Sequence, residues 1–375
     1  MEKGQHPQQP PDWPASLMLL TTLLGKNRED AGRLAPGLGA SDWSVFRDLA
    51  VERHRVAPMI AASLSSADLE VPESIAGDIR TAARQCGAAA LAQRTESLRI
   101  NASLNARGIS ALWLKGWPLA EWLYGGIGLR HASDIDLLVA PEDRAAAARC
   151  LAEAGYAAEP GHGLRSRLIA HPAVGTECKD LEFRHAQTGM RVELHWRTNH
   201  FRSWPGVDAL GEPPVVVTDG PSPIHMLGPL GQLIYLSAHG QQHLFGRLKW
   251  LLDIARLSEK RGVERLASDL RRATELGAGV PARLALHLVG AIFGSSVPPE
   301  AERLVPREAA WAGEITKTIA DPRLAPGLLE TRIAFYRWHW RMAEGRRQRL
   351  GVLRDAVWRR LRLGAVGLVS PGAAR

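Results

Sequence analysis

The stretch Ser133-Asp134-Ile135-Asp136-Leu137-Leu138-Val139 predicts a buried strand that carries two carboxylates. Side chains alternate along a strand, so Asp134 and Asp136 project from one face while the apolar residues between and after them point to the core. Paired carboxylates suit a hard divalent cation, which prefers oxygen ligands and also holds phosphates. We expect Mg²⁺ or Mn²⁺ here. In the alternative reading, one aspartate caps a turn and the other is a solvated edge residue.

The residues around this stretch predict a strand–helix–strand–helix unit. An apolar strand over 109–114 ends at Lys115-Gly116, and a helix initiated by Pro118 follows up to Tyr124. After the strand at 134–139, a second helix begins at Pro141 and ends near Gly155. We therefore expect a small sheet with helices connecting its strands.

A later β-hairpin supplies a third carboxylate. Residues 181–186 and 190–197 flank Gln187-Thr188-Gly189, and in the second strand Glu193 and His195 alternate with apolar side chains. Glu193 and His195 then share one face, and Glu193 completes a metal site with Asp134 and Asp136 if the two strands are neighbours. The catalytic and metal-binding candidates are therefore Asp134, Asp136 and Glu193.

Helical patterns flank this central region on both sides. A long Ala-rich helix is expected over 73–106 and another over 232–260. The fold class is accordingly α+β, with a small mixed sheet between helical regions. The expected division of the chain is a disordered lead-in (1–15), an N-terminal helical region (16–108), a core that contains the sheet and the paired carboxylates (109–215), a C-terminal helical domain (216–345) and a basic amphipathic tail (346–375).

Length and composition favour a folded protein in the cytoplasm. The chain has 375 residues and 45% apolar content, which is enough for a substantial core. We expect no membrane span, because no apolar stretch approaches the roughly 18–20 residues that a bilayer requires. Residues 1–15 lack the apolar segment of a signal peptide. Three dispersed cysteines predict neither a disulfide framework nor a zinc finger.

The positive charge is concentrated at the C-terminus. Residues 332–375 contain eleven arginines and two acids, so this segment carries +9, whereas the rest of the chain carries −1. Arginines alternate with apolar residues at helical spacing over 346–362, which predicts a basic amphipathic helix. Such a tail fits an anionic partner, although a charge run is often only a solvated face.

Five residues are candidates for binding a phosphate-bearing ligand: Lys115, Gly116, Arg130, Ser133 and His195. Gly116 permits close approach of a phosphate, and Lys115 can neutralise it. Arg130 either clamps a triphosphate through two hydrogen bonds or pairs with Asp136 or another acid for structural reasons. His195 can orient Glu193, donate to phosphate, act as a base or serve only a structural role.

Two further histidines, His239 and His243, are spaced four residues apart on one helix face. No glutamate stands between them in an HExxH pattern, so zinc binding is the weaker interpretation. The alternatives are that they face the catalytic cleft or pack against Trp250. Asp253 is expected to pair with one of these histidines or with Lys249.

The chain also resembles the uncharacterised nucleotidyltransferase family of the DNA polymerase β-like superfamily. The similarity rests on Leu114-Lys115-Gly116, Ser133 to Val139, Ala154-Gly155-Tyr156, Val192 to Trp196, the region from His239 to Leu257, and Arg55-Val56-Ala57-Pro58, and it spans about residues 16–260. It implies a small mixed sheet with flanking helices, a metal on Asp134 and Asp136, and Glu193 as the third acid. Lys115-Gly116 departs from the usual Gly-Ser or Gly-Gly phosphate loop.

The implied reaction is metal-dependent transfer of a nucleoside monophosphate to an acceptor hydroxyl, with release of pyrophosphate. The expected donor is ATP, and the acceptor is a small molecule, a peptide or a protein, with tRNA still open. Two rival functions remain. One is a catalytically silent nucleotide-binding or interaction protein, and the other is a nucleic-acid-binding protein that acts through its basic C-terminal helix.

Overall fold

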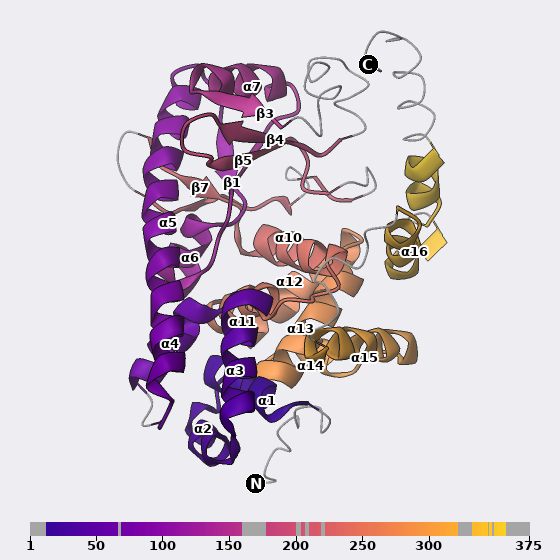
Figure 1. Cartoon of the computed structure of the whole chain (residues 1–375). Helices are drawn as coiled ribbons and strands as arrows, with labels where there is room; N and C mark the ends of the chain where they lie inside the picture. Colours follow the sequence, from indigo (N-terminus) through magenta and orange to yellow (C-terminus); the bar gives the residue numbers. More distant parts are fainter. Residues whose placement is uncertain are drawn as a thin grey trace.

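The computed structural model describes residues 13–66, 69–159, 178–199, 204–206, 210–218, 222–321, 332–343, 345–346 and 349–357. Within them the chain forms one mixed β-sheet between N-terminal and C-terminal helices, which confirms the expected α+β class (Figure 1). Most of the expected disordered lead-in and most of the expected basic tail (347–348 and 358–375) lie outside the described residues. Residues 349–357 are helical, in agreement with the expected tail helix.

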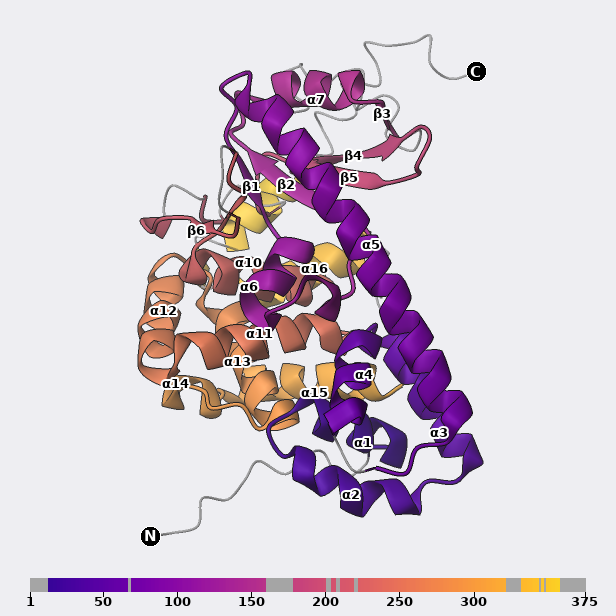
Figure 2. The ribbon, with the colours of Figure 1, turned by 90° about the vertical axis from the view of Figure 1, so that its left-hand side faces the viewer.

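The N-terminal region is helical, as predicted. The long helix α5 (Glu73–Asn105) is followed by Gly108 in a left-handed conformation. A shorter set of helices precedes it: α1 (Ala15–Leu24), α2 (Ala31–Leu34), α3 (Ala40–Asp48), the π-helical turn η3 (Leu49–Arg53) and α4 (Ala57–Ser66). Figure 2 shows α5 crossing one face of the sheet, with its first half extending down to α3 and α4.

The sheet has seven strands in the order β3-β4-β5-β2-β1-β7-β6. Their bounds are β1 (Ala111–Trp113), β2 (Ile135–Val139), β3 (Tyr156–Ala158), β4 (Asp180–His185), β5 (Arg191–His195), β6 (Val215–Val216) and β7 (His225–Met226). The predicted hairpin is present as antiparallel β4 and β5. Strand β2 lies between antiparallel β1 and parallel β5, so it occupies the centre of the sheet.

Helices α6 (Trp117–Tyr124) and α7 (Arg144–Glu153) connect the strands, each following directly after one of them. Helix α6 begins directly after Gly116 and ends at left-handed Gly125, and α7 packs on β3 and β5. The sheet continues to Met226, past the expected core boundary at residue 215, because β7 pairs in parallel with β1. A strand of two residues such as β7 is too short to show an alternation of apolar and polar residues, so the sequence did not predict it.

The C-terminal region consists of α10 (Pro229–Gln242), α11 (Leu248–Arg261), α12 (Val263–Glu275), α13 (Gly279–Phe293), α14 (Pro299–Glu302), α15 (Pro306–Ala320) and α16 (Arg332–Met342). The single helix expected over 232–260 was wrong, because the chain breaks between α10 and α11. Leu244 and Phe245 adopt left-handed backbone conformations there. Phe245 folds back so closely that a Cβ on Gly240 would lie 2.2 Å from its ring.

One continuous cluster of buried apolar side chains runs through all three regions, from α1 through the sheet to α15. Helix α10 lies next to the sheet, and α11 packs on α10, on α13 and on α6, the helix that follows β1 (Figure 1). The helical regions therefore pack on the sheet and position the loops at its edges. Among the described residues, no helix is both long and apolar enough to cross a membrane.

Candidate active site

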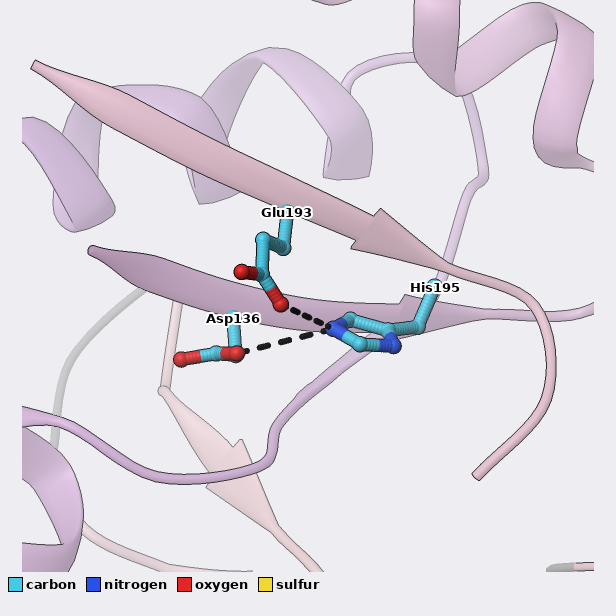
Figure 3. Close-up of side chains that lie close together, drawn as sticks. All are labelled: Asp136, Glu193 and His195. Atoms are coloured by element: carbon cyan, nitrogen blue, oxygen red, sulfur yellow. Dashed lines mark ion pairs between the residues drawn. The ribbon is translucent and has the colours of Figure 1, made fainter. Parts of the chain in front are cut away.

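Asp136 and Glu193 lie directly opposite each other on the parallel strands β2 and β5. His195 follows on the same face of β5, and its Nε2 lies 3.5 Å from Asp136 Oδ1 and 3.3 Å from Glu193 Oε2 (Figure 3). One ligand atom from each of the three residues lies within 4.8 Å of the others. Two strands far apart in the sequence thus place two carboxylates and an imidazole around one point.

Asp136 is the most unusual member of this group, because it is an acid in a strand that is otherwise apolar and fully buried. Its side chain is 0% exposed, Lys115 is its ion-pair partner, and neither carboxylate oxygen has a well-formed hydrogen bond in the described part of the chain. A buried carboxylate that makes so few hydrogen bonds has lone pairs left for a ligand. The donor set fits a divalent cation: the carboxylates suit Mg²⁺ and Mn²⁺, whereas an imidazole is the more usual ligand of Zn²⁺ and other transition metals.

Lys115 brings a positive charge to the same carboxylate. It follows β1, where Leu114 N–H donates to Asp136 O, and its Nζ lies 3.0 Å from Asp136 Oδ1. Burial opposes the charge, but Asp136 and Asp134 together raise the pKa of Lys115 well above its usual value. The neighbouring Gly116 has φ 82°, a conformation that favours glycine and starts α6 beside the backbone of Asp134. Lys115 is therefore charged at the site.

The three grouped residues have shifted pKa values that follow from burial and from each other. Burial raises the pKa of Asp136, partly opposed by Lys115. Burial acts to raise the pKa of Glu193 as well, but His195 and Lys115 outweigh it and the pKa is lowered. For His195, burial and Lys179 act to lower the pKa, yet the two carboxylates raise it overall. Glu193 therefore stays ionised at neutral pH.

Asp134 and Ser133 precede β2 and lie outside the group of Asp136, Glu193 and His195. Asp134 is half-buried at the start of β2 and is not a member of the three-residue cluster, although its charge raises the pKa values of Lys115 and Asp136. Ser133 is exposed and lines a pocket. The structure therefore brings together Asp136, Glu193, His195 and Lys115, with Asp134 beside them.

Arg130 has the structural role that was one of its two sequence interpretations, but with a different partner. Its Nε and Nη2 donate to the two carboxylate oxygens of Asp253, at 2.8 and 2.9 Å, and the Tyr124 hydroxyl donates to Asp253 at 2.7 Å. The pairing of Asp253 with a histidine or with Lys249 was therefore wrong. Asp253 lies on α11, 123 residues from Arg130, so no local pattern pointed to this contact.

His239 and His243 pack against Trp250, as one of their sequence interpretations had it. The rings of His243 and Trp250 stack with centroids 4.9 Å apart, and His239 meets Trp250 edge-on at 5.8 Å. Burial lowers the pKa of His239 well below its usual value and that of His243 to about 4. Across the described ranges, neither belongs to a three-residue metal cluster, and both are neutral rings on the side of α10 that faces Lys115 and Glu193.

Sequence reasoning overlooked several polar residues around the site. Asp180 Oδ2 lies 3.8 Å from His195 Nδ1, and Lys179 is close enough to affect its pKa. The signal was available, because the hairpin register places Asp180 opposite His195. Tyr235 and Lys249 come from α10 and α11, and only the tertiary structure brings them near.

Comparison with known families agrees with this geometry. The chain matches the family described as uncharacterised nucleotidyltransferase over residues 39–294, which is more than half of its length. The protein therefore belongs to this family, and the resemblance seen in the sequence is confirmed, with the matched region shifted toward the C-terminus. No curated protein and no solved structure matches the chain.

Proposed function

We propose that this protein transfers a nucleoside monophosphate from an NTP to a hydroxyl group of an acceptor. The observation that carries the proposal is the pairing of Asp136 with Glu193 across β2 and β5, beside His195, in a chain of the nucleotidyltransferase family. A buried carboxylate with unused lone pairs supports a cation-binding centre. Asp136, Glu193 and His195 would hold the cation, and the charge of Asp134 acts on the same centre.

In the reaction, the acceptor oxygen forms a bond to the α-phosphorus while the bond from that phosphorus to the pyrophosphate oxygen breaks. The acceptor proton is released to water. A bound Mg²⁺ or Mn²⁺ supplies electrostatic stabilisation of the phosphates and lowers the pKa of the acceptor hydroxyl. The lowered pKa of Glu193 favours its role as a ligand over that of a general base.

The remaining residues would set the charge and geometry of the centre. Lys115 is a permanent cation beside Asp136, and in the presence of substrate it can turn from that carboxylate to a phosphate oxygen. Asp180 faces the other ring nitrogen of His195, Nδ1, and would orient the ring so that Nε2 points to the cation beside Glu193. The Gly116 backbone leaves room for close approach at the start of α6.

ATP is the expected donor, and a small molecule, peptide or protein is the expected acceptor. A cytoplasmic site of action is part of the proposal, since ATP and Mg²⁺ are both abundant there, and the three cysteines are free thiols. The silent nucleotide-binding alternative makes a different prediction. It requires MgATP binding without any release of pyrophosphate.

The test is incubation of the full-length protein with each α-labelled NTP, Mg²⁺ and fractionated cell lysate, followed by identification of the labelled product. We expect label in a specific fraction with wild type and none with Asp136→Asn. Glu142→Gln, at an exposed position before α7, is the matched control and should behave as wild type. ATP binding without labelled product in any fraction would support the silent alternative and overturn the proposal.

A further inference from the structure

A pocket of about 400 Å³ opens beside Ser133, the residue immediately before Asp134. This volume is within the range of small-molecule sites, about 300–1,000 Å³. The pocket lies between the N-terminal helices and the loop that leads into β2. Its polar lining residues come from four parts of the chain: Glu52, Arg55, Gln85, His131, Ser133 and Arg191.

The pocket has an excess of positive charge. Arg55 and Arg191 line it against a single acid, Glu52. Arg191 contacts Glu182 at 3.6 Å, whereas Arg55 forms no ion pair or side-chain hydrogen bond with any described residue. An uncompensated arginine in a pocket wall is suited to an anionic ligand, because its planar group donates to two phosphate oxygens at once.

Lys249 lies near this pocket but does not carry a full positive charge, because burial lowers its pKa to about 7. The His54 ring nitrogen Nδ1 accepts a hydrogen bond from Leu248 N–H at 3.2 Å, which ties the residue before Arg55 to the residue before Lys249. Burial, together with the nearby Lys249 and Arg55, lowers the pKa of His131 to about 3, so the His131 ring in the pocket wall is neutral. The positive charge of the pocket therefore comes from its arginines.

Arg55 also has an unusual, left-handed backbone conformation. Val56 N–H donates to Ala50 O at 2.8 Å and His54 N–H to Leu49 O at 2.8 Å, so the chain closes the preceding helical turn with Arg55 at φ 55°. Glycine is the usual residue at such a left-handed position. A long side chain there is disfavoured, and strained conformations of this kind cluster at functional sites.

We propose that this pocket binds the polyphosphate of the nucleotide, and that the N-terminal helical region contributes Arg55 to it. The inference rests on the proposed nucleotidyl transfer and adds a substrate contact outside the sheet. Lys115 is one cation and pairs with Asp136 in the absence of substrate, so a triphosphate needs further cations. Arg55 and Arg191 provide them at the end of the sheet where β2 begins, next to Ser133.

The test measures binding by titration calorimetry of the full-length protein, with tripolyphosphate and MgATP as separate probes and adenosine as the uncharged one. Arg55→Gln should weaken binding of both phosphate probes about tenfold or more, the size of a lost charge-assisted hydrogen bond. Arg55→Lys should recover part of the loss. Arg265→Gln, at an exposed position on α12, should bind as wild type does.

Arg191→Gln, at the other arginine of the pocket lining, provides a second variant in case Arg55→Gln does not fold, and circular dichroism checks both. Wild-type affinity of folded Arg55→Gln and Arg191→Gln for tripolyphosphate and MgATP would overturn the inference and would leave the pocket to an anionic group of the acceptor. Because binding needs no turnover, this result is separable from the labelling experiment, which tests the transfer itself. A loss confined to the phosphate probes, with adenosine unchanged, would support the polyphosphate assignment.

Discussion

The guanidinium of Arg130 is held by both carboxylate oxygens of Asp253, and both side chains are almost completely buried, at 4% and 0% exposure. This fork joins the loop that precedes β2 to helix α11. It also orders the adjacent residues His131 and Ser133, which line the cationic pocket. This buried ion pair thus helps to fix the position of β2 relative to α11.

Asp253→Ala should therefore destabilise the fold strongly. The substitution leaves the Arg130 charge buried without a partner, and such a change costs about 3–5 kcal/mol. Urea unfolding followed by tryptophan fluorescence measures the difference. As a control, Asp30→Ala removes the exposed pair with Arg33, and its cost should stay below about 1 kcal/mol. Equal losses for the two variants would contradict the structural role assigned to the fork.

Binding of Mn²⁺ should depend on the grouped carboxylates. Asp136→Asn and Glu193→Gln each remove a charged ligand, so each should weaken Mn²⁺ binding at least about tenfold, which is the lower end of the effect of even an outer-shell partner. Electron paramagnetic resonance of free Mn²⁺ measures this without turnover. Asp134→Asn tests whether the first aspartate also contacts the ion. Unchanged binding in Asp136→Asn would remove the basis for a metal centre here.

Stability should decrease in acid because of buried neutral histidines. Burial lowers the pKa of His54 to about 3, below the ordinary value of 6.5, so the unfolded chain binds the proton more readily. The neutral His54 ring therefore contributes its full stabilisation above pH 6.5, and this contribution is lost progressively as the pH falls toward 3. At pH 4 the free energy of unfolding should be about 3 kcal/mol lower than at pH 7 because of this one group.

The measurement is the melting temperature of wild type and His54→Gln between pH 4 and pH 7. The variant should be less stable at pH 7, where it loses the contact with Leu248 N–H, but its stability should change less with pH. Parallel pH profiles for the two proteins would contradict the assignment of His54. The remaining slope in the variant should come from other buried histidines such as His131, whose pKa is also lowered to about 3.

Gly240→Ala should disturb the break between α10 and α11. The new methyl group would lie 2.2–2.5 Å from atoms of the Phe245 ring, so the ring must move. Overpacking of this kind costs about 1–3 kcal/mol, which thermal unfolding can detect. The double variant Gly240→Ala/Phe245→Leu should show a loss different from the sum of the single variants, because the two sites are in contact. Strict additivity would argue against this packing.

The N-terminal lead-in and the basic tail are predictions that the described residues leave untested for the most part. Residues 349–357 are helical, and three of their apolar side chains, Leu350, Leu353 and Val357, are at least half exposed. The expectation of an anionic partner for the tail remains a prediction. A steep salt dependence of binding that disappears on removal of residues 346–375 would support it.

The sequence by itself determined the local features of the site. The apolar run after Asp136 predicted a buried strand, and alternation in the later hairpin placed Glu193 and His195 on one face, because successive side chains of any strand point to opposite sides. Gly116 and Pro118 likewise marked the start of α6 through their backbone preferences. These features need no knowledge of distant residues.

Only the tertiary structure decided which distant residues meet. The sequence did not reveal that β5 is the parallel neighbour of β2, that Asp253 is the partner of Arg130, or that Arg55 and Lys249 lie beside one pocket. Each of these contacts depends on how the helices and the sheet share one core, and many residues could have satisfied the same local pattern. Local sterics select the elements, whereas packing of the whole chain selects their partners.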